Sequence, residues 1–342
     1  MGETLEAGSG ARLEHGGDLG EARRQFPAAS EPWIDLSTGI NPVPYPLPCI
    51  PAAAWQRLPA RADEAALLAA ARAAYRVPDR AAIVAAPGTQ ILIETIPTLA
   101  PAGAEVAVLG PTYGEHAHAW RKAGFAVRET ADPDAAGTAA IVVIVNPNNP
   151  DGRIVARADL NRTAARLAGM GGLLVVDEAF ADFTPEASIV PDLPPATVVL
   201  RSFGKTYGLA GLRLGFAIGP ADLAARLADR LGPWAVPGPA LHVGRVALSD
   251  RDWLTATRAE READAARLDA LLASSGRVAG GTALFRLLET PEAPALFERL
   301  GRHGIHVRRF AAHPHRLRFG LPGDEAAWQR LAAALAADEP AR

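Results

Sequence analysis

Lys205 is one of only two lysines in a chain with 35 Lys and Arg residues, and it lies in the segment RSFGKTYGLAGLRLGF, residues 201–216. A lysine side chain can lose its proton and then act as a nucleophile or form a Schiff base, whereas arginine stays charged in proteins. The second lysine, Lys122, follows an arginine in a stretch that reads as a surface helix. Lys205 is therefore the candidate nucleophile, and its neighbours Gly204 and Gly208 allow a tight backbone around it.

Four other polar motifs share one feature, which is a position directly after an apolar run. They are PGTQ at residues 87–90, NPNNPDG at residues 146–152, Asp177–Glu178, and Arg201–Ser202. Each motif alone is most often a turn, a helix N-cap or an ordinary acidic pair. In an open parallel sheet, however, ligands bind at the carboxyl ends of the strands, so four motifs at such ends favour one shared site.

Together, these motifs fit a phosphorylated, cationic aromatic aldehyde that is bound to a lysine. A glycine turn that leads into a helix N-terminus offers free N–H groups to a phosphate. Ser202 adds a hydroxyl group, and Arg213 adds a permanent charge for the same phosphate. A buried Asp177 can keep a pyridine nitrogen protonated, which makes the ring an electron sink, while Lys205 forms the imine.

The elements that must position these residues are short apolar runs that alternate with helical stretches. The runs are rich in β-branched residues and occupy 81–86, 105–110, 141–146, 172–180, 197–203 and 214–219. Runs without polar alternation predict strands that are covered on both faces, and the helices between them predict parallel pairing with right-handed crossovers. We therefore predict an α/β fold with a mostly parallel central sheet and a smaller α+β domain.

The domain boundaries follow from two changes in the pattern. Residues 41–51, NPVPYPLPCIP, contain five prolines and predict an extended linker. After about residue 245, a long Arg/Glu/Ala helix leads into shorter strands and a last amphipathic helix. We predict an N-terminal arm at 1–45 that belongs to the small domain and covers the active site, a large cofactor-binding domain at 46–244, and a small domain at 245–342.

Composition narrows the class of protein. The 342 residues carry a formal net charge of −3, so the overall balance predicts no nucleic-acid or membrane partner. The single cysteine, Cys49, excludes an internal disulfide, and eight scattered histidines predict no metal site. The first residues lack the apolar core of a signal peptide, and no run reaches the roughly 18 apolar residues of a membrane span. We expect a cytoplasmic enzyme.

The motifs PGTQ, GPTY, NPNNPDG, VVDEAF and SFGKTYGLAGLRLG resemble those of the fold-type I pyridoxal-phosphate enzymes, over about residues 88–219. The resemblance is to the aminotransferase branch, which includes histidinol-phosphate aminotransferase, and it implies pyridoxal 5′-phosphate as the cofactor. The implied catalytic residues are Lys205, Asp177 and Tyr113. The implied roles are imine formation by Lys205, pairing of the pyridine nitrogen with Asp177, ring stacking by Tyr113, a hydrogen bond from Asn149 to the ring 3′-oxygen, and phosphate binding by Gly88, Thr89, Ser202 and Arg213.

Two N-terminal stretches resemble a narrower group within this branch. EHGGDLG at 14–20 and WIDLSTGINP at 33–42 resemble the signature of the threonine-phosphate decarboxylase subfamily, which supplies aminopropanol phosphate for cobalamin biosynthesis. Phe180 in DEAF, where histidinol-phosphate aminotransferases usually have Tyr, agrees with that subfamily. The resemblance implies decarboxylation of L-threonine O-3-phosphate to (R)-1-aminopropan-2-yl phosphate and CO2. A histidinol-phosphate-type aminotransferase is the alternative, and a non-catalytic cofactor-binding module of a regulator is an alternative of another class.

A small phosphorylated amino-acid substrate needs an anion site of its own. The candidate substrate-binding residues are His15, Gly16, Asn41, Asn149 and Arg318. Family analogy favours Arg318 for a substrate anion, either the carboxylate or the phosphate. Because enzymes of this fold usually dimerise with a shared site, the resemblance also implies a homodimer, and the linker near Tyr45 is the candidate segment for crossing between subunits.

Overall fold

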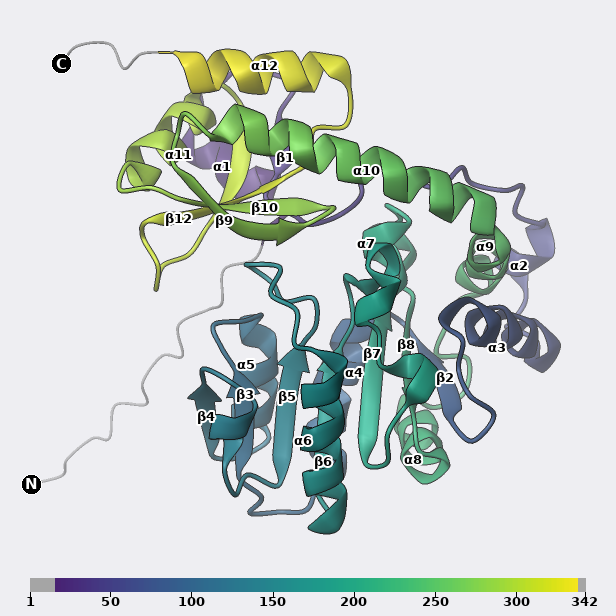
Figure 1. The fold of residues 1–342 in the computed structure, drawn as a ribbon. Coiled ribbons are helices and arrows are strands. Elements are labelled where there is room, and N and C mark those ends of the chain that lie inside the picture. The colour runs from purple at the N-terminus through teal and green to yellow at the C-terminus, as the bar shows by residue number, and fades with distance from the viewer. Residues whose placement is uncertain (1–15, 338–342) are drawn as a thin grey trace, which may run out of the picture.

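The computed structural model describes residues 16–337 and, within them, contains two β-sheets (Figure 1). The large sheet has seven strands in the order β2-β8-β7-β6-β5-β3-β4. These strands are β2 (Ala82–Ala86), β3 (Val106–Leu109), β4 (Val127–Thr130), β5 (Ile141–Val145), β6 (Leu173–Asp177), β7 (Thr197–Ser202) and β8 (Gly215–Gly219). Strand β8 is antiparallel to β2 and β7, and the other pairs are parallel. The predicted mostly parallel central sheet is confirmed.

Each of the six apolar runs forms a strand of this sheet, whereas β4 was not predicted from the sequence. Strand β4 lies at the sheet edge and pairs only with β3. Its residues Arg128 and Glu129 are exposed, so the strand lacks the continuous apolar pattern of the buried strands. An edge strand needs less burial, which is why the apolar pattern missed it.

The small sheet joins the beginning of the described chain to its end. Its five strands follow the order β1-β11-β12-β10-β9. They are β1 (Ile34–Leu36), β9 (Arg277–Thr282), β10 (Phe285–Glu289), β11 (Ile305–Arg309) and β12 (Arg316–Gly320). Because β1 pairs in parallel with β11, the N-terminal segment belongs to a sheet that is otherwise formed after residue 276. The boundaries of the three predicted domains stay predictions.

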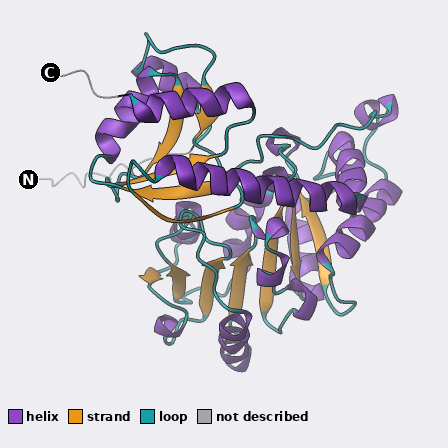
Figure 2. Ribbon diagram, turned by 45° about the horizontal axis from the view of Figure 1, so that its top comes forward, coloured by secondary structure: helices purple, strands orange, loops and turns teal. Residues whose placement is uncertain are grey.

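Helices cover both faces of the large sheet (Figure 2). The described helices are α1 (Leu19–Gln25), α2 (Ala52–Gln56), α3 (Arg61–Tyr75), α4 (Thr89–Thr95), α5 (Gly114–Lys122), α6 (Arg157–Gly169), α7 (Phe203–Thr206), α8 (Ala221–Leu231), α9 (Gly238–Ser249), α10 (Arg251–Leu272), α11 (Ala293–Arg302) and α12 (Glu325–Ala336). One core packs α3, α6 and α9 on the sheet, and the opposite core packs α4, α5 and α8. None of these helices is long and apolar enough to cross a membrane.

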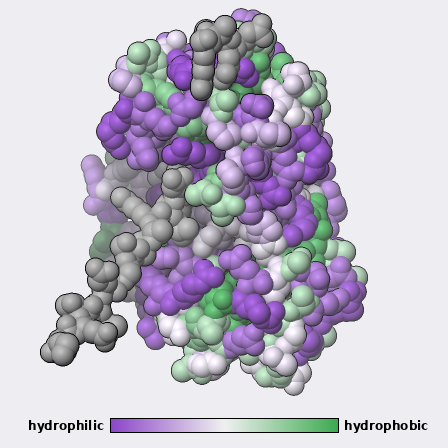
Figure 3. Space-filling model, turned by 90° about the vertical axis from the view of Figure 1, so that its left-hand side faces the viewer, coloured by the Kyte–Doolittle hydropathy of each residue, from purple (hydrophilic) through white to green (hydrophobic). Residues whose placement is uncertain are grey.

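Helix α10 connects the two parts of the molecule. It begins beside α9 near the large sheet and runs to the small sheet, where it packs on β9, β10 and α12 (Figure 1). Polar side chains predominate on the face of the molecule shown in Figure 3, outside the part covered by grey atoms, and apolar residues are dispersed among them. The elements that position the candidate site are the carboxyl ends of β6 and β7, the start of α4, and the segments that extend from the small sheet towards the large one.

Candidate active site

Lys205 lies where the backbone leaves the large sheet. Strand β7 ends at Ser202, and the one-turn helix α7 places Lys205 half-buried above the end of that strand. Burial lowers the pKa of the Lys205 amine to about 8, and the charges of Arg318 and Arg213 lower this pKa further while Asp177 opposes them. An amine with this pKa is partly unprotonated near neutral pH, which a nucleophilic lysine requires.

Two contacts define the surroundings of Lys205, one beside its amine and one behind its backbone. The ring of Phe180 lies 5.8 Å from Nζ, and it packs edge-on against Phe285 at 5.0 Å. Gly204 has no room for a side chain, because a Cβ there would lie 2.7 Å from the Cα of Ala210. A serine or threonine at position 204 would therefore force the Lys205 turn away from the following segment.

Asp177 is the last residue of β6 and is buried, with 3% of its surface exposed. Its Oδ2 lies 2.8 Å from Nε2 of His116, which is also buried, and its Oδ1 accepts a hydrogen bond from the Ala179 N–H at 3.0 Å. These contacts fix the orientation of the carboxylate. His116 was not identified from the sequence; its position one helical turn after Tyr113 in PTYGEHAHAW was the available signal.

The four residues predicted to bind a phosphate come together at the start of α4. Gly88 has a φ of +90°, and a Cβ there would lie 2.6 Å from Nη2 of Arg213. Ser202 pairs with Gly215, and a Cβ on Gly215 would lie 2.7 Å from the Thr89 nitrogen. Glycines thus bring the Arg213 guanidinium and the strand position next to Ser202 close to the N-terminus of α4, and N–H, hydroxyl and guanidinium groups bind phosphate.

Tyr113 lies at the N-cap of α5, and its hydroxyl donates a hydrogen bond to Gln90 Oε1 at 3.2 Å. Burial raises the pKa of the Tyr113 hydroxyl to about 12, with further contributions from Glu115 and Asp177. The hydroxyl therefore stays protonated at neutral pH and acts as a donor. Gln90 belongs to the PGTQ motif and received no role from the sequence, although its own Nε2 donates to Glu115.

Arg318 and Asn149 lie on the side of the site that faces the small sheet. Arg318 donates from Nη1 to Asn149 Oδ1 and from Nη2 to the Ser37 carbonyl at 2.7 Å, and its guanidinium lies over the Phe285 ring. Its Nε has no hydrogen-bond partner within residues 16–337. Burial and the charge of Arg308 lower the Arg318 pKa to about 10, so this side chain is still a cation at neutral pH.

The N-terminal glycines approach Arg318 through Ser37. The Gly17 N–H donates to Ser37 Oγ at 2.7 Å, and a Cβ on Gly16 would lie 2.4 Å from the Ser37 carbonyl oxygen. Gly16 is therefore placed beside the predicted substrate anion site. His15 lies outside the described residues, so its predicted role stays a prediction.

Asn41 lies behind Lys205. It is buried, its Nδ2 donates to the Thr206 carbonyl at 2.9 Å, and its Oδ1 accepts from Arg261 Nη1 at 3.3 Å. These contacts are with the protein itself. A direct contact between Asn41 and substrate stays a prediction, and Arg261 is a residue that the sequence did not point to.

No group of three or more His, Cys, Asp or Glu in the described part of the chain is arranged to hold a metal ion. The site is instead a lysine with a lowered pKa, a buried aspartate, and two separate sets of cationic and N–H groups.

A protein-family model matches most of the chain. The family described as "Aminotransferase class I and II" matches residues 57–335. The chain belongs to this aminotransferase family. It is 47% identical over 328 residues to a threonine-phosphate decarboxylase from Pseudomonas aeruginosa, covering 94% of this chain and 97% of that relative. It is also 46% identical over 332 residues to a threonine-phosphate decarboxylase from a Sinorhizobium species, covering 95% and 98%.

The fold is shared with solved aminotransferase structures. A histidinol-phosphate aminotransferase from Sinorhizobium meliloti, crystallised with pyridoxal-5′-phosphate, superposes with a TM-score of 0.77 over 94% of each chain at 24% identity. At that identity the likeness shows the aminotransferase fold alone. It confirms the predicted fold-type I architecture, and the family membership confirms the resemblance found in the motifs.

The site residues of this chain that only the structure revealed all support other side chains. Four residues that were not predicted as ligands each contact a predicted site residue. They are His116, Gln90, Ser37 and Arg261. They hold other side chains in place, and a supporting side chain has no fixed spacing from the residue that it supports.

Proposed function

We propose that the site binds pyridoxal 5′-phosphate, because its groups fit the three functional parts of that molecule. Lys205 offers an amine with a lowered pKa to an aldehyde. Asp177, held by His116, offers a buried carboxylate to a ring nitrogen. Gly88, Thr89, Ser202 and Arg213 offer N–H, hydroxyl and guanidinium groups to a phosphate. When bound, this cofactor supplies a protonated ring that accepts the electron pair released at the substrate Cα.

We further propose that the protein decarboxylates L-threonine O-3-phosphate to (R)-1-aminopropan-2-yl phosphate and CO2, for the aminopropanol linker of cobalamin. The observation that carries this proposal is the 47% and 46% identity to two threonine-phosphate decarboxylases over nearly their whole lengths. The geometry supports this proposal, since Arg318, which donates to Asn149 and to the Ser37 carbonyl, offers a second cation for a substrate anion besides Arg213.

The chain's own residues have two tasks in this reaction. Arg318 binds one of the two anionic groups of the substrate, and this contact helps to orient the Cα–carboxylate bond for cleavage. After CO2 leaves, Cα must receive a proton, and Lys205 Nζ is the donor that we propose. A pKa near 8 suits this task, because the amine can carry the proton and also release it near neutral pH.

An aminotransferase of the histidinol-phosphate type is the less supported alternative. One solved relative with that name is 24% identical and therefore shows only the fold, and a curated relative with that name is 36% identical but matches only 57% of this chain. Phe180, buried against Phe285, offers no hydroxyl group to the site, where those aminotransferases usually have Tyr.

The deciding experiment incubates purified protein with pyridoxal 5′-phosphate and L-threonine O-3-phosphate without any 2-oxoglutarate. We expect an absorption band of the lysine-bound cofactor, stoichiometric CO2, and (R)-1-aminopropan-2-yl phosphate by mass spectrometry. A keto acid formed only when 2-oxoglutarate is added would show an aminotransferase. Absence of the band would contradict the cofactor proposal itself.

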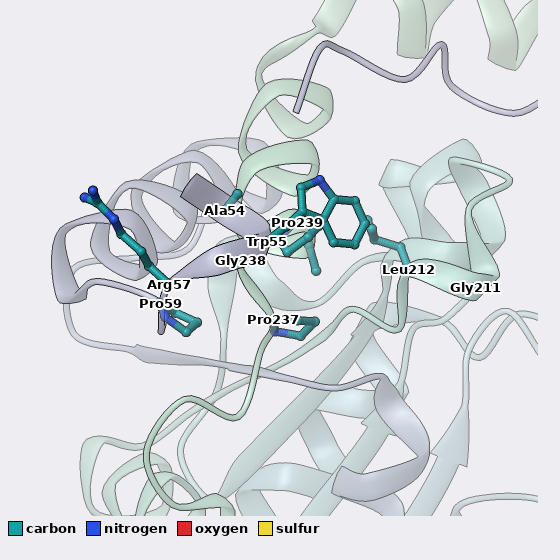
Figure 4. A pocket seen from close by; sticks show the side chains of 10 residues that line it. Ala54, Trp55, Arg57, Pro59, Gly211, Leu212, Pro237, Gly238 and Pro239 are labelled. Carbon is teal, nitrogen blue, oxygen red and sulfur yellow. The ribbon is translucent and has the colours of Figure 1, made fainter. Parts of the chain in front are cut away.

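We also propose that the protein acts as a homodimer through the face around α2. Trp55 is 67% exposed and, with Leu212, lines a cavity of about 340 Å³; Figure 4 shows Trp55 projecting towards Leu212 while Arg57 extends away. Leu58 is equally exposed. Leu212 directly precedes Arg213, so a second subunit seated here would lie next to the phosphate-binding side. Sedimentation at micromolar concentration should give twice the chain mass of 35.8 kDa.

We also propose a cytoplasmic location, which stays a prediction.

A further inference from the structure

The segment 37–45 runs from the small sheet to the Lys205 turn and bonds to it at three points. The Asn41 N–H donates to the Lys205 carbonyl at 2.9 Å, and Asn41 Nδ2 donates to the Thr206 carbonyl at 2.9 Å. The Tyr45 N–H donates to the Tyr207 carbonyl at 2.9 Å. The last carbonyls of a helix have no partner within the helix, and in the four-residue α7 this segment supplies the partners.

Close packing accompanies these hydrogen bonds. Gly208, at a φ of +64°, approaches so closely that a Cβ would lie 2.7 Å from the Asn41 carbonyl oxygen and from the Pro44 Cα. The Lys205 turn therefore lies directly on the segment 41–45, which holds it from the side of the small sheet.

Asn41 is held in turn by a buried charge on the connecting helix α10. Arg261 is only 6% exposed; its Nη1 donates to Asn41 Oδ1 at 3.3 Å, and its Nη2 lies 2.8 Å from Asp264 Oδ2. Its Nε has no hydrogen-bond partner in the described chain. Burying a guanidinium costs free energy that incomplete hydrogen bonding does not recover, so packing alone does not account for an arginine at this position.

We propose that Arg261 and Asn41 form a strut from α10 to the Lys205 turn, and that both are positioning residues for the reaction of the Lys205 amine. The inference rests on the proposed function only in taking Lys205 as the reacting group. Arg261 fixes the Asn41 amide, and Asn41 fixes the carbonyls of Lys205 and Thr206. Through this strut, the position of α10, which packs on the small sheet, determines the position of the Lys205 amine.

The strut predicts a measurable property of the amine. Burial is the largest cause of the lowered Lys205 pKa, and the charged groups that face the amine are Arg318 on β12, Asp177 on β6 and Arg213 before β8. Without the strut, the turn can relax towards solvent while these three charges remain. The pKa should then rise from about 8 towards the ordinary 10.5.

The test uses the full chain freed of cofactor and measures how fast each lysine is acylated as pH is raised, by peptide mass spectrometry. Since the chain has two lysines, the exposed Lys122 is an internal reference in every sample. Asn41→Ala and Arg261→Gln should each raise the Lys205 midpoint by about one pH unit, as expected for partial loss of burial, and leave Lys122 unchanged. Arg258→Gln, on the same helix with a partly exposed side chain paired to Glu262, is the matched control.

Three further results decide the inference. The double variant should shift the midpoint no more than the larger single change, because the two residues act in series. Arg261→Lys, which keeps a charge, should shift it less than Arg261→Gln. Folded variants with an unchanged Lys205 midpoint would overturn the proposal, even if their melting temperatures fall, and so would additive shifts. Because no cofactor or substrate is used, these outcomes do not depend on whether the decarboxylase proposal holds.

Discussion

The two halves of the site are built in different ways. The cofactor half, defined as the proposed cofactor-binding residues Gly88, Thr89, Asp177, Ser202, Lys205 and Arg213, lies at one edge of the large sheet, at the ends of the adjacent strands β2, β8, β7 and β6 or in the turns beside them. The substrate half, defined as Gly16, Ser37, Asn149 and Arg318, joins segments from both sheets; Arg318 is 281 residues from Ser37 and 169 from Asn149. The residues of the first half can be recognised in the sequence as contiguous motifs. The residues of the second half come together only through the packing of the small sheet against the large one.

This difference has a chemical counterpart. In the cofactor half, the proposed phosphate-binding groups include backbone N–H groups, and glycines are required where the backbone approaches its neighbours too closely for a Cβ. In the substrate half, the proposed anion-binding group is one buried guanidinium, Arg318, which donates to two acceptors of the protein. We therefore expect substitutions in the cofactor half to affect cofactor binding or kcat, and substitutions in the substrate half to affect kcat/KM alone.

The largest effect should come from Lys205→Ala. Loss of the amine removes both cofactor attachment and the proposed proton donor, so CO2 release should fall by about 10³-fold or more and the absorption band should disappear. Lys122→Ala is the control, since Lys122 is exposed and pairs with Glu94. Full activity of Lys205→Ala would contradict the proposal that the protein is a pyridoxal-phosphate-dependent decarboxylase.

Arg318→Gln should disable the substrate half alone. We expect kcat/KM to fall by about 10²-fold, since removing a buried charge that binds an anion typically costs about 3 kcal/mol. The absorption band of the bound cofactor should persist. Arg316→Gln, on the same strand but paired with Glu289, should have little effect. Loss of the band in Arg318→Gln would mean that the two halves are not separable.

Trp55→Glu tests whether the exposed apolar face around α2 is the dimer interface. A charge on this exposed apolar face should weaken dimerisation roughly 30-fold, as for the loss of an aromatic anchor of about 2 kcal/mol, and sedimentation would measure it. Met170→Glu places the same charge at another exposed apolar residue and is the control. An unchanged dimer would place the interface elsewhere.

His116→Ala should have the smallest of these effects, and it acts within the cofactor half. We expect kcat to fall about tenfold, because the hydrogen bond to the Asp177 carboxylate contributes about 1.5 kcal/mol. The KM for substrate should change little. His118→Ala is the matched control, since His118 is exposed on the same helix two residues later. Equal loss in both variants would point to general damage to α5.

The sequence predicted most of the fold for identifiable reasons, and it brought the residues of the proposed cofactor half to notice as motifs at strand ends. Six buried strands were found because strands covered on both faces carry unbroken apolar runs. Strand β1 was missed because it has only three residues, and β4 because its exposed edge carries Arg128 and Glu129. The placement of Arg318 beside Asn149 and Ser37 required the packing of the two sheets.

What the sequence by itself determined is the local chemistry: a rare lysine in a glycine-rich turn, an aspartate at a strand end, and a glycine before a helix, each set by residues within a few positions along the chain. Only the tertiary structure decided which supporting groups meet them. His116 meets Asp177 across 61 residues, and Arg261 meets Asn41 across 220. Such pairs have no characteristic spacing, because their contact depends on how helices and sheets pack and not on the backbone that joins them.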